Sequence, residues 1–170
     1  MGSIMSKSVT LIGMPGAGKS TVGVVLAKRL GYAFVDADLI IQQKEGRLLH
    51  QLIEERGLEG FLDIENRINA SLSPQSAVIA TGGSVVYGKE AMEHLVQTTT
   101  VIYLQLSLEA LAQRLGDLRK RGVVLRKGQS LEELYEERVP LYRQYAHITI
   151  DCEKKDISGI VEEIAAILLH

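Results

Sequence analysis

The chain has 170 residues, of which 46% are hydrophobic and 24% are charged, with 19 basic and 21 acidic side chains. This average composition excludes disordered and fibrous proteins, and the length corresponds to about one domain. Because the net charge is only −2, no basic surface is expected for nucleic acid or membranes. No apolar run approaches the roughly 20 residues of a membrane span. We therefore expect one domain over 1–170, in a cytoplasmic protein that is a monomer or a weak homo-oligomer.

Short apolar runs alternate along the chain with segments of helical period. Strands are predicted at 8–12, 33–35, 77–80, 100–106 and 147–150. Helices are predicted at 19–30, 39–44, 48–56, 58–71, 89–96, 107–116, 130–145 and 157–169. Strands that alternate with helices indicate an α/β fold, with a parallel sheet of five strands flanked by helices. Ligands of such sheets bind at the carboxyl ends of the strands.

The octapeptide GMPGAGKS at 13–20 matches the P-loop pattern GxxxxGK[ST], with a predicted strand before it and a helix after it. Its glycines let backbone N–H groups converge on a polyphosphate at a helix N-terminus. In such loops the lysine, here Lys19, reaches the β- and γ-phosphates, and the hydroxyl, here of Ser20, coordinates Mg²⁺. Thr21 stands where a dinucleotide-binding GxGxxG motif needs glycine. We therefore predict a polyphosphate and Mg²⁺ as ligands, with nucleotide contacts at Gly16, Ala17, Gly18, Lys19, Ser20 and Thr21.

Two carboxylates, Asp36 and Asp38, follow the second predicted strand. One can hold Mg²⁺ through water while the other orients and deprotonates an acceptor hydroxyl. Ordinary turn and helix-capping use of aspartate is the alternative. Gly82 and Gly83 follow the third strand and allow a ligand to approach the backbone, although a simple tight turn would use the same residues.

Together these features resemble the shikimate kinase family over nearly the whole chain. The matching segments are GMPGAGKST at 13–21, FVDAD at 34–38, a GxExF motif with a following glutamate at 57–65, TGG at 81–83, an arginine-bearing loop at 114–121 and RVPLY at 138–142. The resemblance implies a nucleoside-monophosphate-kinase-like P-loop fold with a lid at about 117–129 and a substrate-binding helical region at about 38–71. It also implies transfer of the γ-phosphate of ATP to a hydroxyl of a small cyclic alcohol acid.

The resemblance also implies roles for individual residues. Lys19, Asp38 and Arg121 are similar to catalytic residues, with Arg121 as the lid arginine that stabilises the transferring phosphoryl group. Ser20 resembles the Mg²⁺ ligand, and Asp36 the acid that holds Mg²⁺ through water. The adenine contacts are expected at Arg114 and at Lys154, in the loop 152–157. The acceptor contacts are expected at Asp38, Gly82, Gly83 and Arg138, the last of these binding the substrate carboxylate.

The chain departs from the family pattern at three places. The pattern FRxxE becomes FLDIE at 61–65, so that Leu62 replaces an arginine that binds the substrate carboxylate. The pattern GGG becomes GGS, with Ser84 in the third place, and RPLL in the lid becomes RGVV at 121–124. Three functions therefore stay open: a shikimate kinase with a weakened carboxylate clamp, a kinase of the same fold for another small alcohol, and a nucleotide-binding module without phosphotransfer.

Overall fold

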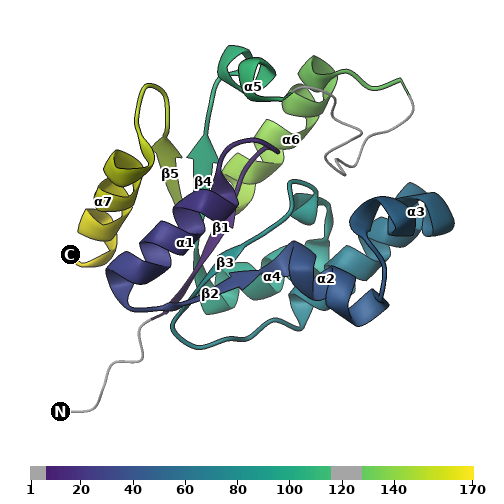
Figure 1. The fold of residues 1–170 in the computed structure, drawn as a ribbon, viewed down its shortest axis with the longest axis horizontal. Helices are drawn as coiled ribbons and strands as arrows, with labels where there is room; N and C mark the ends of the chain where they lie inside the picture. The colour runs from purple at the N-terminus through teal and green to yellow at the C-terminus, as the bar shows by residue number, and fades with distance from the viewer. Residues whose placement is uncertain (1–6, 116–127) are drawn as a thin grey trace.

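The computed structural model describes residues 7–115 and 128–170, and its strands form one parallel sheet in the order β2-β3-β1-β4-β5 (Figure 1). The strands are β1 (Ser8–Ile12), β2 (Ala33–Asp36), β3 (Ala77–Ala80), β4 (Thr99–Gln105) and β5 (Ile148–Asp151). The helices are α1 (Lys19–Leu30), α2 (Ala37–Glu45), α3 (Leu49–Ala70), α4 (Lys89–Thr98), α5 (Leu108–Arg114), α6 (Leu131–Tyr145) and α7 (Ile157–Leu168), with a 3₁₀ turn η1 (Val85–Tyr87) between β3 and α4. The predicted α/β fold is confirmed.

The helices form a layer on each face of the sheet (Figure 1). Helices α1 and α7 pack against each other over one face, and α4 and α6 pack against β4 from the other. Helices α2 and α3 contact each other beyond the β2 edge, at the right of Figure 1. A second, smaller apolar cluster lies between these two helices, around Ile41, Leu52 and Phe61.

The central strand β1 explains why the sequence folds this way. All five of its residues are buried, because β3 and β4 flank it and helices cover both faces. A strand buried on both faces has a continuous apolar run in place of alternation. Its two hydroxyl side chains are satisfied internally: Ser8 Oγ donates to the Pro74 carbonyl at 2.8 Å, and Thr10 Oγ1 lies 2.8 Å from Thr99 Oγ1.

The boundaries differ from the predicted ones by one or two residues at most ends, and the two helices predicted at 48–56 and 58–71 are joined in α3. Gly57 marks their junction, with a non-helical φ of 71° and ψ of 174°. The capping residues were predicted correctly, since Ser107 Oγ accepts from Ala110 N and Ser130 Oγ from Glu133 N. In the described part of the chain, no helix is both long and apolar enough to cross a membrane.

The topology brings three loops together, because β2, β3 and β1 are neighbours and parallel. The P-loop leaves the carboxyl end of β1, Asp38 follows β2, and Gly82 follows β3. The carboxyl ends of parallel strands lie at one edge of the sheet, which is where such sheets bind ligands. Residues separated by about 70 positions in the chain therefore meet at one place.

Close packing of α1 on the sheet depends on Gly23. A Cβ at this position would lie 2.7 Å from Cε1 of Phe34 in β2. We expect Gly23→Ala to lower the free energy of unfolding by about 1–3 kcal/mol, because overpacking outweighs the better helix propensity of alanine. Urea unfolding measures the change. The control is Val24→Ala, at a position 41% exposed, where a change within about 0.5 kcal/mol is expected. A Gly23→Ala protein as stable as the wild type would contradict this packing.

Candidate active site

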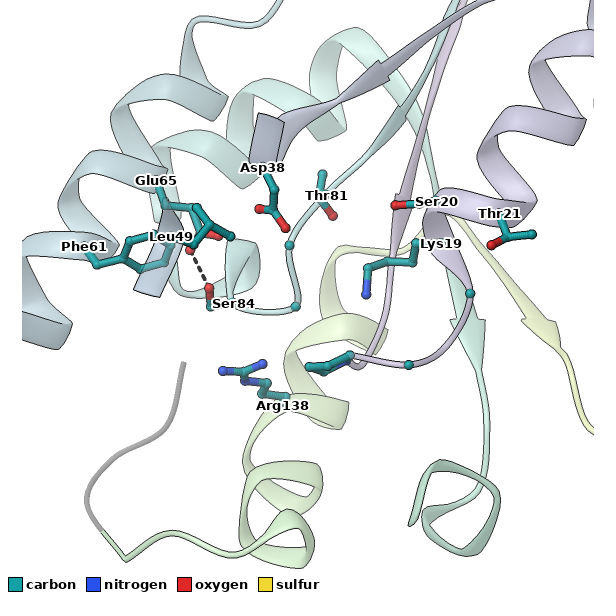
Figure 2. A pocket seen from close by; sticks show the side chains of 15 residues that line it. Lys19, Ser20, Thr21, Asp38, Leu49, Phe61, Glu65, Thr81, Ser84 and Arg138 are labelled. Carbon is teal, nitrogen blue, oxygen red and sulfur yellow. Dashed lines mark hydrogen bonds between the residues drawn. The ribbon is translucent and has the colours of Figure 1, made fainter. Parts of the chain in front are cut away.

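A cavity of about 410 Å³ lies at the carboxyl ends of β1, β2 and β3 (Figure 2). This is the size of a small-molecule site. Its first half is the P-loop and the start of α1, which contribute Pro15, Gly16, Gly18, Lys19, Ser20 and Thr21. Its second half is built from α2, α3, α6 and the turn after β3, which contribute Asp38, Leu49, Phe61, Glu65, Thr81, Gly82, Gly83, Ser84 and Arg138. One cavity thus joins the predicted phosphate and acceptor sites.

The P-loop surrounds a buried ammonium group. Lys19 Nζ donates to the carbonyl oxygens of Gly13 at 2.7 Å and Met14 at 2.9 Å. The loop can turn this tightly because Gly16 and Gly18 have φ of 84° and 91°, a region that side chains disfavour. Burial lowers the pKa of Lys19 to about 8, against the nearby charge of Asp38, which raises it. A buried cation at a helix N-terminus favours the binding of an anion.

The residues present fit a magnesium ion beside a polyphosphate. Ser20 and Thr21 open α1, line the cavity and are exposed, so the Ser20 hydroxyl is accessible to a metal ion. Mg²⁺ commonly takes one or two protein ligands and completes its shell with water and phosphate oxygens. Within the described residues, no three histidine, cysteine or acidic side chains cluster as a ready-made metal site. Ser20 is therefore the residue best placed to hold Mg²⁺.

Asp36 caps helix α2. Its Oδ1 accepts from the backbone N–H groups of Asp38 at 3.0 Å and Leu39 at 3.2 Å. This is the capping use that the sequence left open as an alternative. The side chain does not line the cavity, and its role as an acid that holds Mg²⁺ through water stays a prediction. The cap also has a positional effect, since it fixes the first turn of α2, from which Asp38 enters the cavity.

Asp38 is a largely buried carboxylate that lines the cavity. Burial and, to a lesser extent, the charge of Asp36 raise its pKa to about 6, although the charge of Lys19 opposes them. Figure 2 shows its carboxylate beside the turn after β3. A general base works best with a pKa close to the working pH. Asp38 meets that requirement, and it lies in the same cavity as Lys19.

Glu65 is a second carboxylate in the cavity, and its side chain is 2% exposed. Its Oε1 accepts from Ser84 Oγ at 2.7 Å. Burial raises its pKa to about 7, whereas the Ser84 hydrogen bond lowers it. This glutamate ends the motif at 57–65, but no role was predicted for it from the sequence. The spacing within α3 could have identified it, because Phe61 and Glu65 are four residues apart and share a helix face.

The turn after β3 brings these groups together because it has no side chains. A Cβ on Gly82 would lie 2.8 Å from Asp38 Oδ1 and 3.0 Å from Glu65 Oε2. A Cβ on Gly83 would lie 2.9 Å from both Arg138 Nη1 and Pro15 Cδ. Real Cβ atoms almost never approach other atoms so closely. Both glycines are therefore required for close approach, and a tight turn alone does not explain them.

Arg138 crosses from α6 into the cavity and is 1% exposed. Its guanidinium carbon lies 5.3 Å from the centroid of the Tyr87 ring, and its Nε donates to Tyr87 Oη at 3.3 Å. Tyr87 in turn donates to Glu137 Oε1 at 2.7 Å. One helical turn later, Tyr142 Oη donates to the Gly83 carbonyl at 2.6 Å. Helix α6 is thus tied to the glycine turn through Tyr142 and to η1 through Arg138.

Leu62 does not stand in the cavity. It is half-buried and packs against the apolar cluster between α2 and α3, and it is absent from the cavity lining. The replacement of the family's arginine therefore removes a cation without placing an apolar side chain against the ligand. The guanidinium that the described residues do place in the cavity belongs to Arg138.

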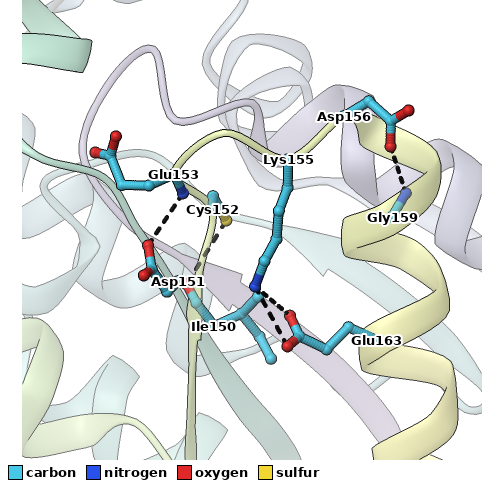
Figure 3. Close-up of polar contacts among 8 residues, drawn as sticks. All are labelled: Ile150, Asp151, Cys152, Glu153, Lys155, Asp156, Gly159 and Glu163. Atoms are coloured by element: carbon cyan, nitrogen blue, oxygen red, sulfur yellow. Dashed lines mark hydrogen bonds and ion pairs between the residues drawn. The ribbon is translucent and has the colours of Figure 1, made fainter.

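The predicted adenine contacts lie outside the cavity. Arg114, at the end of α5, donates from Nη1 to the Gly16 carbonyl at 3.2 Å and so reaches the P-loop. Lys154 is exposed, with a φ of 56°. Figure 3 shows the loop around it, which is ordered by hydrogen bonds from Glu153 N to Asp151 Oδ1 and from Gly159 N to Asp156 Oδ1, and by the Lys155–Glu163 ion pair. Adenine binding by Arg114 and Lys154 stays a prediction.

Most of the predicted site residues meet in the cavity. The structure brings together Gly16, Gly18, Lys19, Ser20, Thr21, Asp38, Gly82, Gly83 and Arg138. Ala17 is buried within the P-loop and does not line the cavity. Arg121 and most of the predicted lid at 117–129 lie outside the described residues. No site role was predicted from the sequence for Glu65, Ser84 or Tyr87.

Comparison with known proteins identifies the family. The family model described as shikimate kinase matches residues 15–169. A shikimate kinase from Sulfurihydrogenibium sp. is 35% identical over 93% of this chain and 95% of its own length, and one from Paracidovorax citrulli is 38% identical over 93% and 90%. The solved structure of the Acinetobacter baumannii shikimate kinase in complex with shikimate matches with a TM-score of 0.83 and 30% identity, over 96% of this chain and 93% of that one. These matches confirm the expected phosphotransferase acting on an alcohol. The chain belongs to the shikimate kinase family.

Proposed function

We propose that the protein transfers the γ-phosphate of ATP to the 3-hydroxyl of shikimate, forming shikimate 3-phosphate, with Mg²⁺ as the metal. The observation that carries this proposal is the single cavity that joins the P-loop cation, Lys19, to two carboxylates and a buried guanidinium. Phosphoryl transfer needs little covalent chemistry from a protein, so that positioning and charge are the main requirements. The ammonium, the two carboxylates and the guanidinium in this cavity supply the positioning and the charge.

The nucleotide half of the cavity suits the phosphates of ATP. The ammonium of Lys19 is already held by two P-loop carbonyls, so little ordering is needed when the phosphates bind. Mg²⁺ at Ser20 would neutralise negative charge on the phosphates. We further propose that Arg114 and Lys154 border the adenine, since Arg114 already contacts the P-loop at Gly16.

The acceptor half suits a small polyol acid. Asp38 orients a hydroxyl and removes its proton during attack, because its raised pKa makes it a competent base. Arg138 binds the carboxylate through a charge-assisted hydrogen bond. Gly82 and Gly83 let the substrate lie against the backbone between these two groups. The base and the carboxylate-binding arginine thus hold the two ends of one small molecule.

Leu62 does not favour a different acceptor. Its side chain packs away from the cavity, and Arg138 remains buried at the position expected to bind the carboxylate. A hydrogen bond to a charged group contributes about 1.5–3 kcal/mol, which corresponds to roughly ten- to hundred-fold in affinity. Loss of one arginine should therefore raise the KM for shikimate without abolishing turnover. We also propose a cytoplasmic protein, monomeric or weakly self-associating, whose partners are small molecules.

The proposed function is tested by ADP release in the presence of Mg-ATP and a panel of acceptors, namely shikimate, quinate, simple polyols and hydroxy amino acids. We expect turnover with shikimate and at most weak turnover with the others. Asp38→Ala is the control for a contaminating kinase, since it should lower turnover by about a hundredfold or more while the protein stays folded. Robust activity on a non-acid acceptor alone, or none with any acceptor, would contradict the proposal.

The pH dependence follows from the two carboxylates. Burial raises the pKa of Asp38 to about 6 and that of Glu65 to about 7. Both are expected to act in the ionised form, which is lost as the pH falls through these values. With Mg-ATP saturating, kcat/KM for shikimate should therefore fall steeply as the pH drops from about 8 to about 5. The slope of log(kcat/KM) against pH should approach two, because two carboxylates take up a proton. Melting temperatures at each pH verify folding. A flat profile would contradict the requirement for ionised Asp38 and Glu65.

A further inference from the structure

Glu65 is a buried carboxylate without a counter-charge on its own face of α3. Residues three and four positions away share its helix face, and these are Phe61, Leu62, Ile68 and Asn69. None of them carries a charge. The side chain is nonetheless 2% exposed. A buried carboxylate needs hydrogen-bond donors or cations nearby to remain ionised, so its partner must come from another element.

Ser84 supplies that donor from the glycine turn. It follows Gly83 directly, is 3% exposed, and donates from Oγ to Glu65 Oε1 at 2.7 Å. Figure 2 shows this hydrogen bond, with the hydroxyl below the carboxylate. The other oxygen, Oε2, lies on the Gly82 side, 3.0 Å from where a Cβ of Gly82 would stand. The hydrogen bond thus fixes the carboxylate with one oxygen satisfied by the protein and the other at the acceptor side of the cavity.

The surrounding charges leave the ionisation of Glu65 finely balanced. Asp38 on α2 disfavours the charged form, whereas Arg138 on α6 and Lys19 on α1 favour it. The Ser84 hydroxyl adds to the second group. An ionised Glu65 can accept a hydrogen bond from a substrate hydroxyl at either carboxylate oxygen. A protonated Glu65 carries a hydrogen on one oxygen and so has less capacity to accept. Loss of the Ser84 hydroxyl therefore shifts Glu65 toward the form that is the poorer acceptor.

We propose that Ser84 is a positioning residue, which holds the Glu65 carboxylate ionised and aimed at a hydroxyl of the acceptor. This inference rests on the proposed function, because the hydroxyl belongs to the acceptor of that reaction.

The test is the pH profile of Ser84→Ala, with Mg-ATP saturating. At pH near 7 we expect KM for shikimate to rise about tenfold, with kcat within about twofold of wild type once the pH is well above the pKa of Glu65. The fall of kcat/KM that is caused by protonation of Glu65 should begin at a higher pH, because the pKa of Glu65 rises when the hydrogen bond is lost. In a Glu65→Gln background, Ser84→Ala should produce no such shift.

The matched control is Ser8→Ala. Ser8 is also a buried serine, 4% exposed, and its hydroxyl bonds to the Pro74 carbonyl and to Ala77 N in the sheet. Its loss should lower the melting temperature without moving the pH profile. If Ser84→Ala behaves in the same way, or if its profile superimposes on that of the wild type, Ser84 is only structural and the inference is wrong. A shift that persists in the Glu65→Gln background would also overturn it.

A second readout separates this inference from the proposed function. The carboxyl ¹³C signal of Glu65, followed by NMR across the same pH range, reports its pKa without any turnover. We expect Ser84→Ala to raise that pKa and Ser8→Ala to leave it unchanged. Absence of shikimate turnover by the wild-type protein would defeat the proposed function, whereas an unchanged Glu65 pKa in Ser84→Ala would defeat the role of Ser84.

Discussion

The absence of side chains at Gly82 and Gly83 is the constraint on which the rest of the site depends. Carboxylates from α2 and α3 approach one of these residues, and a guanidinium from α6 together with Pro15 of the P-loop approaches the other. Four elements that are distant in the chain can converge here only because the backbone leaves room. Tyr142 locks the arrangement by donating to the Gly83 carbonyl at 2.6 Å. The turn thus lines the cavity, and side chains from several elements pack against it.

The groups that converge there are charged, and burial outweighs their mutual attraction. The pKa of Lys19 falls, while those of Asp38 and Glu65 rise, with burial as the largest cause in each case. Each group is therefore less well solvated than it would be in water. Phosphates beside Lys19 and hydroxyls beside the carboxylates would supply the missing partners. Such preorganised charges cost stability in the free protein and are used when the ligands bind.

Local patterns in the sequence were enough to predict the sheet, the P-loop and most of the residues that line the cavity. Lys19 and Ser20 lie in a motif whose spacing determines their placement, and Asp38 follows a predicted strand, at the end where parallel sheets bind ligands. Long-range partners were less visible. Glu65 and Ser84 are 19 residues apart, and no local pattern reports that they touch. Leu62 was expected to weaken the carboxylate site directly, but its side chain packs between α2 and α3, which no spacing rule reveals.

The role of the glycine turn is tested most directly by Gly82→Ala. The φ of Gly82 is not in the left-handed region, so alanine is allowed by the backbone and the added methyl group acts through contact alone. We expect kcat/KM for shikimate to fall by about a hundredfold or more, because Asp38 and Glu65 must move away from the acceptor. Binding of Mg-ATP, measured by titration, should stay close to wild type. A Gly82→Ala protein with wild-type kcat/KM for shikimate would contradict the convergence of these carboxylates on the substrate.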